Sequence, residues 1–151
     1  MRSMSLVPTV LSSSQITGDV SWRPAVRRIG TISNLRVIVS HAGAALPILT
    51  ERIDLLLPLL GRSEGAPPKS MRETLRNLHF DLAGAPIPEL LGALLQIADD
   101  NRIHYGSDYP FTPPDACVSL LHQIEATPLL NQDLRTRIFR DNALNLFPQL
   151  E

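Results

Sequence analysis

The sequence predicts an α/β fold with a parallel sheet, and two observations lead to this prediction. Three short apolar segments with the composition of β-strands alternate with longer segments in which apolar residues recur at helical spacing. Each gap between strands is long enough for a helix, as a parallel crossover requires. With 44% hydrophobic and 19% charged residues in a chain of 151, one domain with a substantial core is expected.

The first part of the chain is expected to carry little regular structure. Residues 1–20 show no sustained periodicity and are interpreted as a poorly defined lead-in, which leaves residues 21–151 as one domain. Ser21 can cap a short helix that has Pro24 in its first turn and ends near Gly30.

The first strand is expected at residues 35–40 (LRVIVS), which are β-branched and almost wholly apolar. Such a run without alternation favours a strand covered on both faces. A helix should follow over residues 47–60, where apolar residues recur at helical spacing, with Gly61 as its stop. The polar, Pro- and Gly-rich residues 62–70 predict a loop.

The alternation then continues to the end of the chain. Two further strands are expected at 78–82 (LHFDL) and 103–106 (IHYG). Helices are expected at 88–98, from Pro113 or Pro114 to about Ile124, at 131–139 with Asn131 as its cap, and at 142–147.

Composition excludes several classes of partner. Fourteen basic and fifteen acidic residues leave no global field that would attract nucleic acid or a membrane surface. A single cysteine excludes an intramolecular disulfide framework and a Cys-cluster metal site. The richest apolar stretch, residues 53–61, is far shorter than the roughly 20 apolar residues of a membrane span. A cytoplasmic location is therefore expected.

Two strand ends carry residues with chemical potential. His41 directly follows the first strand and precedes small residues that leave room for a ligand, and Asp108 follows the third. In α/β folds, chemistry gathers where strands lead into helices. A carboxylate there can bind a divalent metal or carry a proton. Each position also has a structural interpretation: His41 can cap a strand end, and Asp108 can form a turn before Pro110.

Other polar residues are assigned structural roles. His79 and Asp81 share one face of the second strand, where a hydrogen-bonded pair is favoured over metal ligation. His104 and His122 are expected to be packing or surface residues. Cys117 is expected to act as a small buried hydrophobic residue.

Three segments together resemble the amidohydrolase-related family, specifically the metal-dependent non-oxidative decarboxylases that act on aminocarboxymuconate semialdehyde, 6-methylsalicylate or resorcylate. Residues 35–43 (LRVIVSHAG) resemble the sixth strand of that family, residues 78–84 (LHFDLAG) the seventh and residues 105–111 (YGSDYPF) the eighth. Asn142-Ala143 with Leu146-Phe147 resembles the closing helix, so the likeness covers about residues 22–149.

The resemblance implies a (β/α)8 TIM barrel, of which this chain would hold about the last three strand–helix units and the C-terminal helices. It implies one divalent metal, zinc or manganese, with Asp108 as a ligand. It implies His41 as an acid/base residue that also binds substrate. The reaction would be decarboxylation of a small-molecule hydroxyaryl or related carboxylic acid, with the metal as Lewis acid and a general acid delivering the proton.

The chain departs from the family pattern in its metal ligands. The family has a His-x-His pair on strand one and a third histidine on strand five, but no histidine precedes His41 here. A whole barrel needs ~250 residues. A truncated chain is therefore expected, inactive alone or completed by a second copy or another polypeptide. Two alternatives stay open: a metal-dependent amide or lactone hydrolase, and a non-catalytic barrel fragment that binds a partner.

Overall fold

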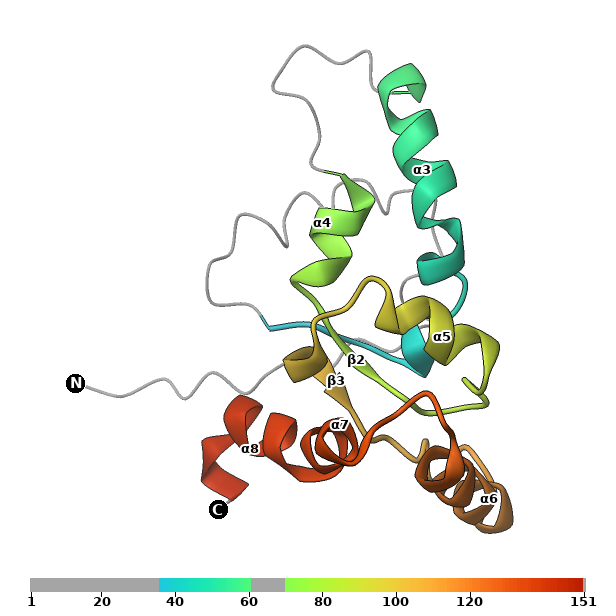
Figure 1. Cartoon of the computed structure of the whole chain (residues 1–151), viewed down its shortest axis with the longest axis vertical. Helices are drawn as coiled ribbons and strands as arrows, with labels where there is room; N and C mark the ends of the chain where they lie inside the picture. Colours follow the sequence, from blue (N-terminus) through green and yellow to red (C-terminus); the bar gives the residue numbers. More distant parts are fainter. Residues whose placement is uncertain (1–35, 61–69, 151) are drawn as a thin grey trace, which may run out of the picture.

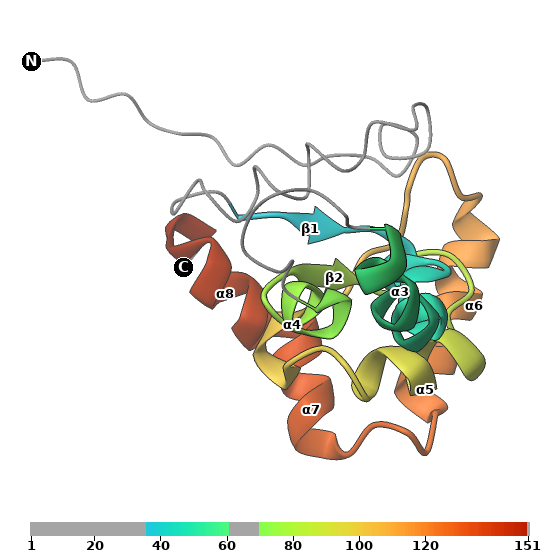
Figure 2. The same cartoon turned by 90° about the horizontal axis from the view of Figure 1, so that it is seen from above.

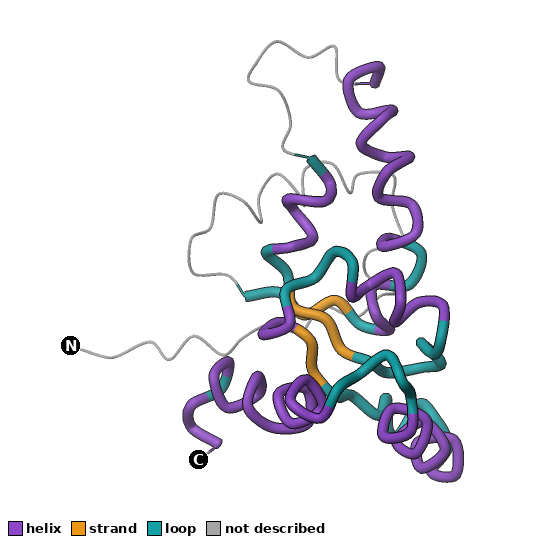
Figure 3. The backbone as a smooth tube through the Cα atoms, viewed as in Figure 1, coloured by secondary structure: helices purple, strands orange, loops and turns teal. Residues whose placement is uncertain are grey.

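Three parallel strands form the centre of the molecule (Figure 3). The computed structural model of the chain describes residues 36–60 and 70–150. The strands are β1 (Ile38–Val39), β2 (His79–Asp81) and β3 (Ile103–His104), and β2 lies between the other two. Phe80 pairs with Val39 on one side and with Ile103 on the other. The predicted parallel α/β arrangement is confirmed, with shorter strands than the sequence pattern suggested.

Helices fill both crossovers between the strands (Figure 1). The first crossover contains the 3₁₀ turn η1 (His41–Gly43), α3 (Leu46–Leu60) and α4 (Met71–Arg76). The second contains α5 (Glu89–Leu95) and the 3₁₀ turn η2 (Asp100–Arg102). The predicted helices at 47–60 and 88–98 are confirmed, although α5 is shorter at its C-terminal end.

Helix α4 was not predicted from the sequence, although a local signal for it exists. Ser70 is its N-cap, and the Ser70 hydroxyl accepts a hydrogen bond from the backbone N–H of Glu73 at 3.0 Å. A serine followed three residues later by glutamate is the start of a capping box. The carboxylate of Asp54 on α3 accepts the N–H groups of Met71 and Arg72, so α3 caps its neighbour as well.

The C-terminal segments form one nearly continuous helical stretch after α6. Helix α6 (Pro114–Ala126) lies on the side toward which the strands point (Figures 1 and 2). It is followed by α7 (Gln132–Thr136), the π-helical turn η3 (Arg137–Asp141), α8 (Asn142–Leu146) and the 3₁₀ turn η4 (Pro148–Leu150). Asn131 caps α7 as predicted, since its side chain accepts the Leu134 N–H at 2.8 Å. The expected break between helices at 131–139 and 142–147 is wrong, because the backbone stays helical through η3.

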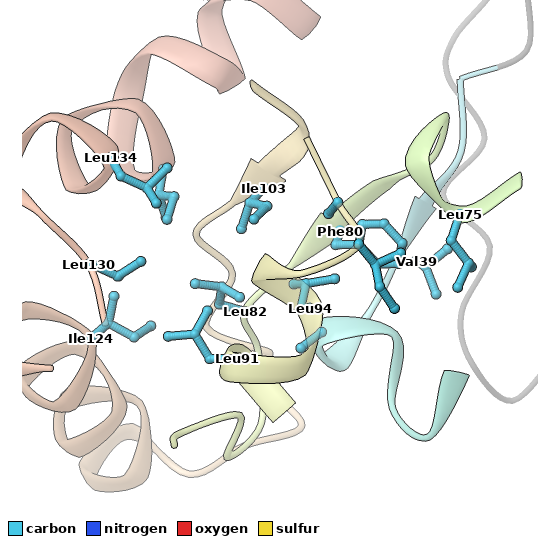
Figure 4. Packing of buried hydrophobic residues seen from close by; sticks show 14 of the residues in the cluster. Val39, Leu75, Phe80, Leu82, Leu91, Leu94, Ile103, Ile124, Leu130 and Leu134 are labelled. Atoms are coloured by element: carbon cyan, nitrogen blue, oxygen red, sulfur yellow. The ribbon is translucent and has the colours of Figure 1, made fainter. Parts of the chain in front are cut away.

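The core lies on one face of the sheet. Phe80 and Leu82 are fully buried, whereas His79 and Asp81 between them are only half-buried. Figure 4 shows this face packed with aliphatic side chains from the helices that cover it, α4, α5, α6 and α7. The alternation extends into β1, where Val39 is buried and its neighbour Ile38 is partly exposed. Within the described residues, β1 is therefore fully covered on one face, and the expectation of a strand covered on both is not met.

A chain of hydrogen-bonded basic residues crosses the second face of the sheet. Arg102 Nη1 donates to His79 Nε2 at 3.1 Å, so this ring nitrogen carries no proton. His79 Nδ1 therefore holds the proton of the neutral ring and donates it to His104 Nε2 at 2.8 Å. His79 thus pairs with His104, on the neighbouring strand, and not with Asp81. His104 is a packing residue, as expected, and is buried.

This histidine pair predicts a loss of stability in acid. Burial, and then the charge of His104, lower the pKa of His79 to about 4 from 6.5, with smaller contributions from Arg102 and Arg36. Burial also lowers the pKa of His104, against the opposing charge of Asp81. The unfolded chain then binds more protons than the folded one between about pH 6.5 and pH 4, so stability falls as the pH drops through this window. Because His79 keeps part of its surface in water, we expect about 1–2 kcal/mol from it.

Urea unfolding at pH 7.5 and pH 5 measures this effect. His79→Gln should show a smaller decrease in unfolding free energy between the two pH values than the unmodified chain. His122→Gln, at an exposed site on α6, is the matched control and should leave the decrease unchanged. An equal decrease in all three proteins would show that the histidine pair does not control acid stability.

Several sequence expectations lie outside the described residues. These are the lead-in at residues 1–20, the short helix at 21–30 and most of the loop at 62–70, so the proposed domain boundary at residue 21 stays a prediction. None of the described helices is both long and apolar enough to cross a membrane.

Candidate functional site

The ends of β1 and β3 carry an unusual concentration of left-handed backbone. Within the described residues, the non-glycine residues with positive φ all lie there: His41, Ala42 and Ala44 after β1, and Asp108 after β3. Such conformations cost free energy of order 1–3 kcal/mol each and persist where surrounding contacts enforce them. They cluster at active sites and ligand clamps, which makes these two strand ends the candidate functional site.

His41 begins this site at the end of β1, with φ at 57°. Its backbone N–H donates to Asp81 Oδ1 at 2.9 Å. Its imidazole packs against the backbone of Gly84, where an added Cβ would lie 3.0 Å from Nδ1. The strand-end hydrogen bond expected as the structural role of His41 is therefore present, and it is made by the backbone, which leaves the imidazole to other contacts.

Asp81, at the end of β2, connects the neighbouring strand ends. Its Oδ1 atom accepts both the His41 N–H and the N–H of Ala83, the latter at 3.0 Å. The third strand passes close on the other side, because a Cβ added at Gly106 would lie 3.0 Å from Asp81 Cβ. The expected pair of Asp81 with His79 is therefore wrong. The position of Asp81 at the end of the middle strand, between the strands that lead to His41 and Asp108, was the signal for its role at the site.

Asp108 follows β3 by four residues and has φ at 62°. Its Oδ2 atom accepts the Thr112 hydroxyl at 2.8 Å, and its backbone carbonyl accepts the Thr112 N–H at 2.9 Å. The turn expected as its structural role is present. One carboxylate oxygen is held by Thr112, which orients the group and leaves Oδ1 as the atom to bind a ligand.

His41 and Asp108 thus lie at the same edge of the sheet, but their hydrogen bonds go to different partners. They follow the two outer strands, and neighbouring strands lie about 4.8 Å apart, so the strand ends are separated by roughly 10 Å.

The described residues do not complete a metal site. Among them, no group of three or more His, Cys, Asp and Glu side chains could hold a metal ion. A catalytic zinc has three protein ligands, and the strand ends offer the Asp108 carboxylate as one. The site residues fit a metal only as a partial donor set.

Two further residues singled out in the sequence, Cys117 and His122, both lie on α6. His122 is exposed on α6, as a surface residue. Cys117 is half-buried, where burial was expected, and its Sγ atom donates to the Ser107 carbonyl at 3.2 Å.

Comparison with known proteins gives the family. The amidohydrolase family model matches residues 25–149, which is most of the chain. A 6-methylsalicylic acid decarboxylase from Penicillium expansum is 34% identical over 116 residues, covering 77% of this chain and 36% of that protein. One from Aspergillus aculeatus is 35% identical over 120 residues, with the same coverage of each. The chain therefore spans about a third of the length of the curated relatives it matches.

Solved structures give the same result. An amidohydrolase II is 32% identical, with a TM-score of 0.70 over 80% of this chain and 37% of that one. A 2,6-dihydroxybenzoate decarboxylase bound to 2,6-dihydroxybenzoate is 25% identical, with a TM-score of 0.60 over 76% and 35%. A dihydroxybenzoic acid decarboxylase from Polaromonas, with bound manganese, shares the fold at 21% identity and a TM-score of 0.64 over 82% and 36%.

The family match covers residues 25–149. This range contains all three parallel strands and the strained residues that follow β1 and β3. The chain belongs to the amidohydrolase family, and its curated relatives there are decarboxylases.

Proposed function

We propose that this chain carries one edge of the active site of a metal-dependent decarboxylase whose substrate is a small hydroxyaryl carboxylic acid. The single observation that supports it most is the placement of His41 and Asp108 in strained backbone after the ends of two parallel strands, at the same edge of the sheet. The relatives that act on 6-methylsalicylate and 2,6-dihydroxybenzoate favour this substrate class.

Within this proposal, β1, β2 and β3 are strands six to eight of an eight-stranded barrel. The C-terminal ends of the strands form the mouth where barrel enzymes bind their substrates. The half-buried face of the sheet, with His79 and Asp81, would be the barrel interior. The cytoplasmic location expected from the sequence goes with this assignment as a prediction.

His41 is proposed as the general acid. Its side chain would donate a proton to the ring carbon that bears the carboxylate, which forms a C–H bond and interrupts the aromatic ring. The C–C bond to the carboxylate then breaks, its electron pair restores the ring, and carbon dioxide leaves. The net reaction exchanges carboxylate for a proton, so no oxidant or reductant is needed. A positioned proton donor of this kind contributes typically 10²–10⁴-fold to the rate.

Asp108 is proposed as one metal ligand, with zinc or manganese as the metal. The described residues do not supply the others, so they are proposed to come from a second copy of the chain or from another polypeptide. The Thr112 hydroxyl bound to Oδ2 would keep the Asp108 carboxylate oriented while Oδ1 is free to ligate.

Variants at the two sites test the proposal. In chain loaded with manganese or zinc, Asp108→Ala should retain no metal by elemental mass spectrometry. His41→Gln should retain the metal but lower turnover of 6-methylsalicylate or 2,6-dihydroxybenzoate about 10²–10⁴-fold. Asp115→Ala and His122→Gln, at exposed positions of α6, are the matched controls and should change neither quantity.

The outcomes separate the rival functions. Turnover of amides or lactones, with none of the hydroxybenzoates, would favour the hydrolase that the same fold also supports. Metal-free chain that converts no substrate and binds other proteins would favour a non-catalytic module. Full turnover in both variants would contradict the assignment of the site residues.

A further inference from the structure

Asp81 occupies the central position of the candidate site. It lies at the end of the middle strand, β2, and a single carboxylate oxygen accepts the backbone N–H groups of His41 and Ala83, at 2.9 and 3.0 Å. Hydrogen bonds from amides to a carboxylate are charge-assisted and roughly twice as strong as neutral ones. This oxygen therefore ties the end of β1 to the end of β2.

The two hydrogen bonds constrain the His41 imidazole in two ways, through the His41 backbone and through the segment on which the ring rests. The first is made by the His41 backbone in a left-handed conformation, with φ at 57°, and helps to hold this costly conformation in place. The second fixes Ala83 and with it Gly84, the residue on which the imidazole rests. Gly84 has φ at 75°, and a Cβ there would lie 3.0 Å from Nδ1, so the ring has little freedom on this side.

Asp81 also touches the strand that leads to Asp108. A Cβ added at Gly106 would lie 3.0 Å from Asp81 Cβ and 3.2 Å from Cγ, so the backbone of this segment passes directly over the carboxyl group. Asp108 follows Gly106 by two residues. The Asp81 side chain therefore packs against the segment that leads to Asp108, while its hydrogen bonds go to the His41 side of the site.

We infer that Asp81 is the positioning residue of this site: its carboxylate sets the backbone of His41 and the seat of the His41 imidazole, and so the direction of the proton donor. This role rests on the proposed function for its catalytic consequence, but the contact itself is independent of any activity. Asp81 touches no reacting atom in this assignment and acts through His41.

Nuclear magnetic resonance on the full chain tests the contact. A scalar coupling across the hydrogen bond is expected between the His41 amide nitrogen and the Asp81 carboxyl carbon, together with a downfield His41 amide proton. Asp81→Ala should abolish the coupling and speed hydrogen exchange of the His41 amide. Asp81→Asn keeps an oxygen acceptor and should restore slow exchange. Asp100→Asn, at an exposed aspartate on η2, is the matched control and should change nothing at His41.

Kinetics on active preparations test the consequence. Asp81→Ala should lower kcat about 100-fold, the scale of a 1 Å misplacement, with KM and metal content unchanged, and Asp81→Asn should recover most of the loss. Absence of the coupling in the unmodified chain, or unchanged His41 exchange in Asp81→Ala, would overturn the inference whatever the activity. A chain that shows the coupling but converts no carboxylic acid would contradict the proposed function and leave the contact established. If Asp81→Ala does not fold, the coupling in the unmodified chain and the His41 exchange rate in Asp81→Asn still test whether Asp81 holds the His41 amide.

Discussion

Phe80→Ala is expected to lower the free energy of unfolding by about 3–5 kcal/mol, a large share of the stability of a domain of this size. Phe80 is fully buried in the middle strand, between Val39 and Ile103. Its ring also fills the space beside Gly43, where an added Cβ would lie 3.1 Å from Cε1. Loss of the ring removes the packing between the core and the turn that follows β1.

Urea unfolding followed by circular dichroism measures this loss. Phe80→Leu keeps most of the buried volume and should cost less than about 1.5 kcal/mol. Phe111→Ala is the matched control, because that ring is 89% exposed, and it should change stability by no more than about 0.5 kcal/mol. A similar cost for Phe80→Ala and Phe111→Ala would mean that the sheet does not form the core of the folded chain.

Much of the fold follows from periodicity in the sequence. The strands around Val39, Phe80 and Ile103 lie inside the apolar segments that predicted them, and Asn131 caps α7 as expected. Strand length is different, because only the part of each apolar segment that pairs with a neighbour forms a strand, and pairing is decided by contacts between distant residues. Helix α4 is too short to show helical periodicity, and its one local signal in the sequence, the Ser70 cap, was not used to predict it.

Less of the candidate site follows from sequence. The position of a residue at a strand end predicts that His41 and Asp108 share an edge of the sheet. It gives no information on which backbone groups a side chain such as that of Asp81 will bind, because those contacts depend on the register of β2 against β1. Alternation correctly predicted that His79 and Asp81 share one face. The hydrogen-bond partner of His79 is nevertheless His104, on the neighbouring strand β3.

The register therefore links the core to the site. The same pairing that buries Phe80 between its neighbours places Asp81 beside the end of β1, one residue further along β2. A slip of one residue would reverse every side chain of the strand and bring Asp81 into the core. Burial of the apolar face thus fixes the register of β2, and the register places Asp81 beside the end of β1. The proposed role of Asp81 therefore depends on the same packing that the Phe80 variants measure.

Asn142→Leu is expected to cost about 2–4 kcal/mol, although leucine is close to asparagine in size and more apolar. The Asn142 side chain is 2% exposed, and its Nδ2 group donates to the carbonyls of Asp100 and Ile103, both at 2.7 Å. Leucine cannot donate, so two carbonyls would lose a partner, each at about 1–3 kcal/mol when buried. These bonds attach α8 to the start of β3, which makes the closing helix part of the sheet's support.

The same variant tests how the closing helix supports the site. The Tyr105 N–H donates to the Ile138 carbonyl at 2.9 Å, so β3 is held by η3 as well as by Asn142. With Asn142→Leu, hydrogen exchange of the Tyr105 amide should accelerate more than that of the His41 amide, because Tyr105 directly follows β3, the strand that loses its support. Asn145→Leu, at an exposed position of the same helix, should affect neither amide nor the unfolding free energy. Equal acceleration at both amides would mean that the three strands open as one unit, and that α8 stabilises the whole sheet instead of β3 alone.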